Sequence, residues 1–261
     1  MVRHLVIDAG NTRIKLGLFA GEGLVEHGVL PSDDPLGLFA VVQALRPDAI
    51  AWGSVARADD AILEQLMAIA PTLVITGATP APVRNAYTTK DTLGADRLAN
   101  AVAAAALFPG RAVLAVDLGT CITYDRVDAT GAYLGGAITP GAHMRAKAMH
   151  AYSARLPLVD HIHIHDHFAT STAGALQAGI HHGVLGELRT FIASHTHHSP
   201  DGAVVLTGGD ALPFARGMKS GIFAHPFLTL EGYRLILKHQ GCYPAPRHPG
   251  TGTDVGSGAA G

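Results

Sequence analysis

The sequence predicts an α/β protein made of two related halves. Segments with the apolar pattern of buried strands alternate with segments of helical periodicity along most of the 261 residues. The stretch LVIDAGNTRIKLGLF near the start is echoed by LAVDLGTCITYDRVD about 110 residues later, so that Asp117 aligns with Asp8 and Gly119 with Gly10. With 48% hydrophobic residues, the chain has enough apolar material for a core in each half.

The first half is expected to contain a sheet and its covering helices. Residues 4–8 and 13–19 read as two strands joined by a tight polar turn, because glycine and asparagine occupy the turn between them. Further strands are expected at residues 24–30, 49–54 and 73–76, and helices at residues 36–45, 58–69 and 96–107.

The second half is expected to begin near residues 109–111, between the helix that starts at Asp96 and the second copy of the repeat. The predicted domains are therefore residues 1–110 and 111–243. Residues 244–261 are rich in proline and glycine and have almost nothing to bury, which predicts a disordered tail. The later elements are expected to be helices at residues 142–151, 171–194 and 228–239 and a strand at residues 203–207.

Composition argues for a cytoplasmic protein that acts on a small molecule. The net charge is -2 with a pI near 6.8, and lysines and arginines are scattered, so we expect neither a nucleic acid nor a membrane as partner. The apolar stretch at residues 98–107 is shorter than the roughly 20 residues that span a bilayer. The N-terminus lacks the pattern of a signal peptide, and Cys121 and Cys242 give no disulfide framework.

The first acidic turn has the composition of a polyphosphate site. A buried strand delivers the carboxylate of Asp8 to a turn in which Gly10 lets backbone N–H groups approach an anion closely. Asn11 and Thr12 add neutral donors, and Lys15 adds a positive charge. Asp8 would then hold Mg²⁺ directly or through water. The alternative is an ordinary hairpin turn capped by aspartate and asparagine.

The second acidic turn, which begins at Asp117, favours the phosphate interpretation because two facing turns can grip phosphates and metal between two domains. Strand, acidic turn and strand in each half resemble the actin-like ATPase superfamily, whose two ribonuclease H-like domains have the active site in the cleft between them. The sequence contains neither a Walker loop nor a dinucleotide-binding glycine motif. Gly208 and Gly209 resemble that superfamily's adenosine-binding turn, although a strand exit that needs positive φ explains them equally well.

A third motif, Gly94-Ala95-Asp96-Arg97, places a carboxylate and a guanidinium at the start of a helix, a position that also suits aspartate electrostatically. DAGNTRIK, GADR, DLGTCIT and GGAITPG in this order resemble the type III pantothenate kinases, and the resemblance covers about residues 5–210. It implies a homodimeric enzyme that phosphorylates pantothenate with ATP, the first step of coenzyme A biosynthesis.

The resemblance also implies roles for single residues. Asp96 would be the general base for the pantothenate hydroxyl, and Asp117 would bind a monovalent cation, K⁺ or NH₄⁺. Arg97 would be free to receive the pantothenate carboxylate, and Thr172 would come from the neighbouring subunit. The ATP site would comprise Asp8, Ala9, Gly10, Asn11, Thr12, Arg13, Ile14, Lys15, Thr120, Gly208 and Gly209. The pantothenate site would comprise Tyr87, Gly94, Ala95, Asp96, Arg97 and Thr172.

Three alternatives stay open. The chain could be a regulatory accessory factor on the same fold, although Asp8, Asp96 and Asp117 are all present. It could also be a kinase of another hydroxylated metabolite, because fold alone does not determine substrate. The histidines at every second position of residues 161–167 would line one face of a strand and could bind zinc or copper, but an exposed connecting segment is the preferred interpretation.

Overall fold

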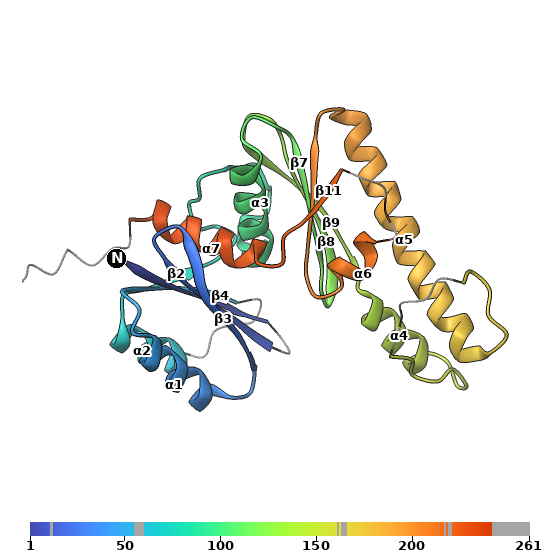
Figure 1. Cartoon of the computed structure of the whole chain (residues 1–261), viewed down its shortest axis with the longest axis horizontal. Helices are drawn as coiled ribbons and strands as arrows, with labels where there is room; N and C mark the ends of the chain where they lie inside the picture. Colours follow the sequence, from blue (N-terminus) through green and yellow to red (C-terminus); the bar gives the residue numbers. More distant parts are fainter. Residues whose placement is uncertain are drawn as a thin grey trace, which may run out of the picture.

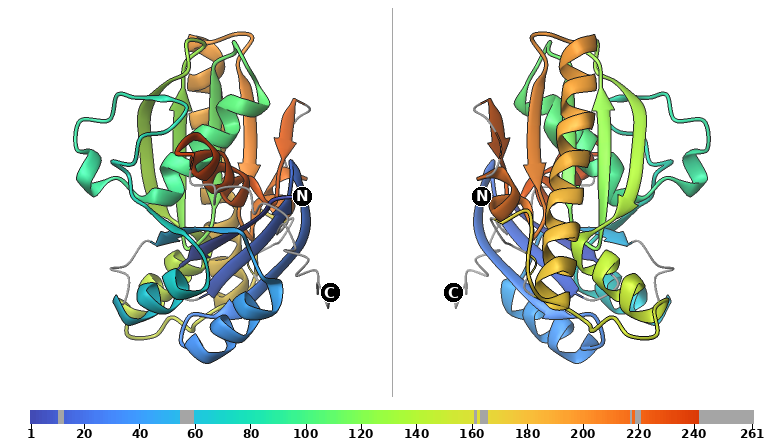
Figure 2. Two further views of the ribbon diagram at one scale, coloured as in Figure 1. Left: turned by 90° about the vertical axis from the view of Figure 1, so that its left-hand side faces the viewer. Right: turned by 90° about the vertical axis from the view of Figure 1, so that its right-hand side faces the viewer.

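In the computed structural model, two β-sheets stand side by side with two helices between them (Figure 1). The structure describes residues 1–10, 13–54, 60–160, 162, 166–216, 218 and 221–241. Further helices cover the outer face of each sheet (Figure 2). The predicted class, an α/β protein of two related halves, is confirmed.

The first sheet has the strand order β3-β2-β1-β4-β5. Its first three strands form an antiparallel meander, and β4 and β5 run parallel to β1. Leu5 and Ile7 of β1 pack under the outer helices, whereas Val6 faces the helices between the sheets, as the alternation of a strand requires. The elements are β1 (Arg3–Ala9), β2 (Arg13–Ala20), β3 (Gly23–Pro31), α1 (Pro35–Leu45), β4 (Ala49–Ser54), α2 (Asp60–Ile69) and β5 (Thr72–Ile75).

The second sheet repeats this plan with the order β11-β10-β7-β8-β9-β6. Strands β7, β8 and β9 form an antiparallel meander, and β10 runs parallel to β7 as β4 does to β1. Its outer face packs on α4, α5 and α6. The elements are β6 (Arg84–Asn85), β7 (Val113–Leu118), β8 (Cys121–Val127), β9 (Ala132–Pro140), α4 (Ala142–Ala151), α5 (Thr172–His198), β10 (Ala203–Thr207), α6 (Ala211–Ala215) and β11 (Ile222–Ala224); a 3-10 turn spans Lys90–Thr92.

Two helices, α3 (Ala95–Leu107) and α7 (Leu228–His239), fill the space between the sheets. Helix α3 packs on β7 and β8, and α7 packs on β1 and β4. The two helices approach closely, since a Cβ on Gly232 would lie 1.9 Å from the carbonyl oxygen of Ala99. Small residues at this contact thus hold the first turn of α3 at the junction of the two sheets.

The elements differ from the sequence predictions at a few points. Helix α5 runs to His198 rather than ending at residue 194, because His195 is still buried in its last turns. Strands β6 and β11 have two and three residues, too few to show a periodic pattern. The helix expected from residue 58 is described from Asp60 onward, and the predicted tail at residues 244–261 lies outside the described residues.

The predicted division at residue 110 falls between α3 and β7. Most of each sheet comes from one side of that point, but β6 pairs with β9 of the second sheet, and α7 packs on the first. Helix α7, which comes late in the chain, covers the apolar inner face of the first sheet. Because segments from each side of residue 110 pack in the other half, the division into two consecutive domains remains a prediction. None of the helices in the described ranges is long and apolar enough to cross a membrane.

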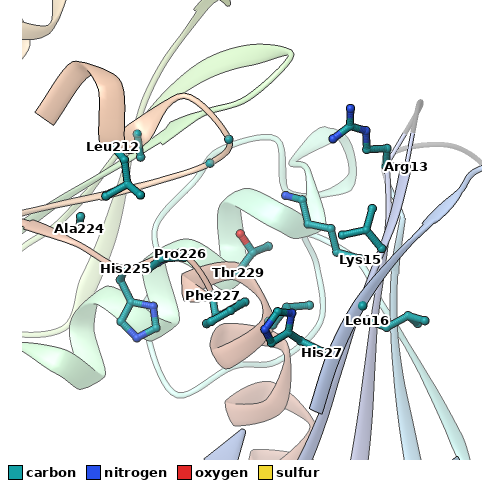
Figure 3. A pocket seen from close by; sticks show the side chains of 16 residues that line it. Arg13, Lys15, Leu16, His27, Leu212, Ala224, His225, Pro226, Phe227 and Thr229 are labelled. Carbon is teal, nitrogen blue, oxygen red and sulfur yellow. The ribbon is translucent and has the colours of Figure 1, made fainter. Parts of the chain in front are cut away.

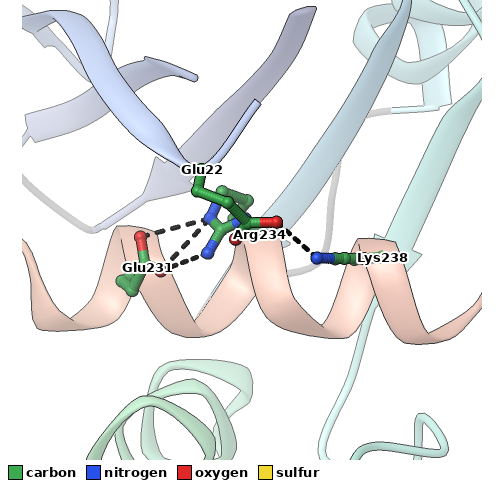
Figure 4. Close-up of polar contacts among 4 residues, drawn as sticks. All are labelled: Glu22, Glu231, Arg234 and Lys238. Atoms are coloured by element: carbon green, nitrogen blue, oxygen red, sulfur yellow. Dashed lines mark hydrogen bonds and ion pairs between the residues drawn. The ribbon is translucent and has the colours of Figure 1, made fainter. Parts of the chain in front are cut away.

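A group of charged side chains fastens α7 to the turn between β2 and β3 (Figure 4). Arg234 donates to Glu22 across 2.9 Å and pairs with Glu231 on its own helix. Lys238 also pairs with Glu22. The Arg234 side chain is only 3% exposed and its guanidinium lies 5.4 Å from the centre of the Phe19 ring, so it contributes both packing and charge.

Replacing this arginine should therefore destabilise the fold without touching the cleft. We expect Arg234→Leu to lower the free energy of unfolding by about 2 kcal/mol, because two carboxylates lose a charged donor. Urea denaturation measures the change. Lys238→Ala is the matched control, since an exposed ion pair contributes little; equal losses in both variants would contradict the role of Arg234.

Candidate functional site

The first acidic turn lies at the C-terminal end of β1, the central strand of the first sheet. Asp8 is only 8% exposed, and the Nζ atom of Lys15 lies 3.7 Å from its Oδ2. The N–H of Gly10 donates to the carbonyl of Arg13 across 3.0 Å, which closes the turn. Burial raises the pKa of Asp8 to about 6; Lys15 opposes the shift, and the carboxylates of Asp96 and Asp117 add to it. Asn11 and Thr12 lie outside the described residues.

The second acidic turn occupies the equivalent place at the end of β7. The Nδ2 of Asn100 on α3 donates to Asp117 Oδ2 across 3.3 Å, and burial raises the pKa of Asp117. Gly208 lies directly against this carboxylate: a Cβ there would be 2.4 Å from Asp117 Oδ1, and its φ is +93°. Glycine is therefore required at position 208 for both backbone conformation and close approach.

The third carboxylate comes from the helix between the sheets. Asp96 is in the first turn of α3, and its Oδ1 accepts from the N–H of Arg97 across 2.9 Å. Gly94 leaves room for it, since a Cβ at that position would lie 2.3 Å from Asp96 Oδ1. Asp96 lies one turn before Asn100, the residue that donates to Asp117, and its negative charge raises the pKa of both Asp8 and Asp117.

Arg97 is committed to a buried partner that the sequence analysis did not identify. Its Nε donates to Asp125 Oδ1 across 2.9 Å, and Nη2 lies 2.7 Å from the same oxygen. Tyr133 donates to that oxygen as well, across 2.7 Å. Nη1 donates to the hydroxyl of Tyr87 across 3.5 Å. The expectation of a free guanidinium is therefore corrected: Arg97 is 4% exposed and holds Tyr87 in place. An aspartate in the apolar run of β8 was the available signal.

A cavity of about 380 Å³ opens between β2, the end of β10 and the start of α7. Of the predicted ATP-site residues, Arg13, Lys15, Gly208 and Gly209 line it. Figure 3 shows Arg13 and Lys15 projecting from β2, with Phe227 and His27 on another side of the hollow. The sequence analysis did not identify the latter two, whose ring centres lie 4.6 Å apart.

Other predicted residues lie elsewhere. The side chains of Ala9 and Ile14 belong to the apolar core under α1 and α2, so only their backbone can face a ligand. Thr120 is exposed in the second turn, and Thr172 is exposed at the start of α5.

The histidine-rich segment is only partly described. Residues 161 and 163–165 lie outside the described ranges. His167 stacks on His182 with ring centres 3.8 Å apart. In the described part of the chain, no group of three histidine, cysteine, aspartate or glutamate side chains could hold a metal ion.

Two sheets of the same plan, with an acidic turn in each and an arginine- and lysine-lined cavity between them, are the arrangement of the actin-like ATPase fold. A ROK hexokinase from Thermus thermophilus has this fold, with a TM-score of 0.50, 17% identity and coverage of 90% of this chain and 98% of that one. A Campylobacter jejuni structure, whose name places it in a Baf family of transcriptional activators, has a TM-score of 0.61 at 20% identity and covers 91% and 98%.

The family follows from closer relatives. The family model for type III pantothenate kinase matches residues 4–194. Type III pantothenate kinases from Porphyromonas gingivalis and Bacteroides fragilis are 39% and 41% identical to this chain, over 90% of its length and 98% of theirs. The chain belongs to the type III pantothenate kinase family. Its activity is the ATP-dependent phosphorylation of pantothenate in coenzyme A biosynthesis, and the resemblance seen in the sequence is confirmed.

Proposed function

We propose that Asp96 is the general base of this kinase. The proposal is supported by the position of Asp96 one turn before Asn100, which donates to Asp117. Asp8 and Asp117 in turn lie against Lys15 and Gly208, which line the cavity. The pantothenate hydroxyl would attack the γ-phosphorus, its proton would pass to Asp96, and the bond to the β-phosphate oxygen would break to release ADP. A carboxylate at a helix N-terminus beside the cleft is suited to this transfer.

ATP would lie in the cavity with its phosphates toward the first acidic turn. Arg13 and Lys15 supply positive charge at the cavity. Gly10 would allow close backbone approach, and Thr120 would contact the phosphates from the second half. The adenosine would lie near Gly208 and Gly209. This orientation is supported by the position of the two basic side chains at one side of the cavity and of apolar and ring side chains at another.

The acidic residues fit the metals that a phosphoryl transfer needs. Carboxylate oxygens suit Mg²⁺, which usually takes one or two of them and completes its shell with phosphates and water. Asp8 would hold Mg²⁺, which neutralises charge on the phosphates when bound. Asp117, which protein surrounds closely and Asn100 orients, would hold K⁺ or NH₄⁺.

Pantothenate would lie beside the start of α3. Tyr87, Gly94 and Ala95 would line its pocket, and Arg97 would act mainly by holding Tyr87, to whose hydroxyl its Nη1 donates. Thr172 of the partner subunit would complete the pocket in a homodimer. Two large exposed side chains support such a contact: Tyr152 after α4 and Phe168 before α5 are 93% and 94% exposed.

We also propose that the enzyme works in the cytoplasm, without a nucleic acid or membrane partner.

The test is ADP release from the purified protein with ATP, Mg²⁺ and pantothenate, with potassium, ammonium or sodium as the only monovalent cation. We expect turnover that depends on pantothenate and on potassium or ammonium. Equal turnover in sodium would overturn the cation site at Asp117. Turnover with another hydroxylated metabolite but not with pantothenate would overturn the substrate pocket. The regulatory alternative has no support here, because a likeness at 20% identity shows the fold alone.

A further inference from the structure

Tyr233 of α7 is a buried residue that the proposed mechanism does not use. Its side chain is fully buried, and its hydroxyl has no hydrogen-bond partner among the described residues. Leaving a buried hydroxyl unpaired is costly, so a group of this kind in a well-packed core calls for an explanation. A role for this hydroxyl at the cleft would provide that explanation.

The fold makes room for this ring at the first acidic turn. Gly53 of β4 is the strand partner of Asp8, and a Cβ on Gly53 would lie 2.1 Å from Cζ and 2.3 Å from Oη of Tyr233. Any side chain at position 53 would therefore displace the ring. The hydroxyl end of the Tyr233 ring therefore lies beside the pair formed by Asp8 on β1 and Gly53 on β4.

Burial raises the pKa of the Tyr233 hydroxyl, and the negative charges of Asp8, Asp96 and Asp117 raise it further. All three carboxylates are hydrogen-bond acceptors. A phenol O–H is a donor that can pair with a carboxylate, whereas an apolar ring end would offer nothing. Asp8 is the natural acceptor, because α7 packs on β1 and β4, and the Tyr233 hydroxyl lies against Gly53, the strand partner of Asp8.

We propose that Tyr233 is a positioning residue, whose hydroxyl donates a hydrogen bond to one carboxylate oxygen of Asp8 and leaves the other oxygen to face Mg²⁺ of the bound nucleotide. In the structure Asp8 Oδ2 faces Lys15 at 3.7 Å. A bound cation would compete with Lys15 for the Asp8 carboxylate, and the hydrogen bond from Tyr233 would then fix the orientation of that carboxylate. The inference rests on the proposed role of Asp8.

The test is Tyr233→Phe, which removes a single oxygen. We expect about a tenfold weaker apparent affinity for Mg²⁺ in the kinase reaction, as for the loss of a hydrogen bond to a charged group, with the KM for pantothenate unchanged. The thermal shift that Mg²⁺ produces in the presence of ADP should shrink as well. Without ligand, the variant should melt at the same temperature as the wild type or higher, because an unpaired buried hydroxyl is gone.

Tyr124→Phe is the matched control, since that buried hydroxyl already donates to Glu187 across 2.8 Å on the far side of the second sheet. It should lower Tm and leave the Mg²⁺ dependence unchanged.

A wild-type Mg²⁺ dependence in Tyr233→Phe would overturn the proposal. A lower Tm of unliganded Tyr233→Phe, like that of the control, would also overturn it, because the hydroxyl would then be paired without ligand. If Asp8→Asn weakens the Mg²⁺ response and Tyr233→Phe does not, only the tyrosine proposal fails; if neither variant does, the role of Asp8 fails too.

Discussion

Asp96→Asn should lower kcat by about a factor of 10² to 10⁴ and leave the fold intact. An asparagine fills the same space, and its carbonyl can still accept from the N–H of Arg97, the hydrogen bond that Asp96 makes in the structure. It cannot take a proton from the attacking hydroxyl. Steady-state ADP release at saturating ATP and pantothenate measures the loss, and thermal melting verifies that the protein is folded.

Removing a negative charge near the cleft could by itself change turnover, so the comparison needs a variant with the same change of charge. Asp91→Asn provides it, because Asp91 is exposed in the 3-10 turn just before α3. Its kcat should stay within about twofold of the wild type, as surface substitutions usually have small effects. If Asp96→Asn raised only the KM for pantothenate, Asp96 would be a binding group and not the base.

The acidic turns could be predicted from the sequence because each lies within a short local pattern. A strand, a carboxylate and a glycine in succession are sufficient to indicate Asp8 and Asp117 at the ends of strands, and the repeat indicates that the two turns are equivalent. The central helix was predictable for the same reason, since the small and apolar residues of α3 recur with helical spacing.

Residues that reach the site from a distance could not be predicted in this way. Asp125 pairs with Arg97 only because β8 and α3 pack together, and no local pattern shows which aspartate of a strand faces a helix. Tyr233 lies more than a hundred residues from either acidic turn, on a helix whose apolar spacing reads as ordinary core. A motif can also include residues whose side chains do not face the site: Ile14 falls inside the first motif, but its side chain packs in the core.

The paired glycines show how a sequence signal with two explanations is resolved by geometry. A strand exit with positive φ and a close approach to a ligand site were alternatives, but Gly208 meets both conditions. Its φ is +93°, and a Cβ there would come within 2.4 Å of Asp117 Oδ1 and 2.5 Å of the carbonyl oxygen of Leu118. Neither atom can move away freely, because one belongs to a carboxylate that Asn100 holds and the other to the backbone of β7.

Gly208→Ala should therefore impair both stability and activity. Backbone strain and overpacking together should lower the free energy of unfolding by about 3 kcal/mol. Displacing Asp117 by even a fraction of its contact distance should lower kcat/KM by about 100-fold, since phosphoryl transfer depends on positioning. Urea denaturation and the ADP-release assay measure the two effects.

Gly209→Ala is the control for the stability effect, because the next residue in the same turn has open space around it: a Cβ there would meet no atom within 4 Å among the described residues, and its φ is not in the left-handed region. We expect its free energy of unfolding to stay within about 0.5 kcal/mol of the wild type. Equal destabilisation by the two alanines would mean that the whole turn resists substitution, and the specific contact between Gly208 and Asp117 would lose its explanatory role. Loss of activity in Gly208→Ala without loss of stability would instead mean that the turn can shift to accept the methyl group, and that the shift moves the Asp117 carboxylate away from the position it needs for activity.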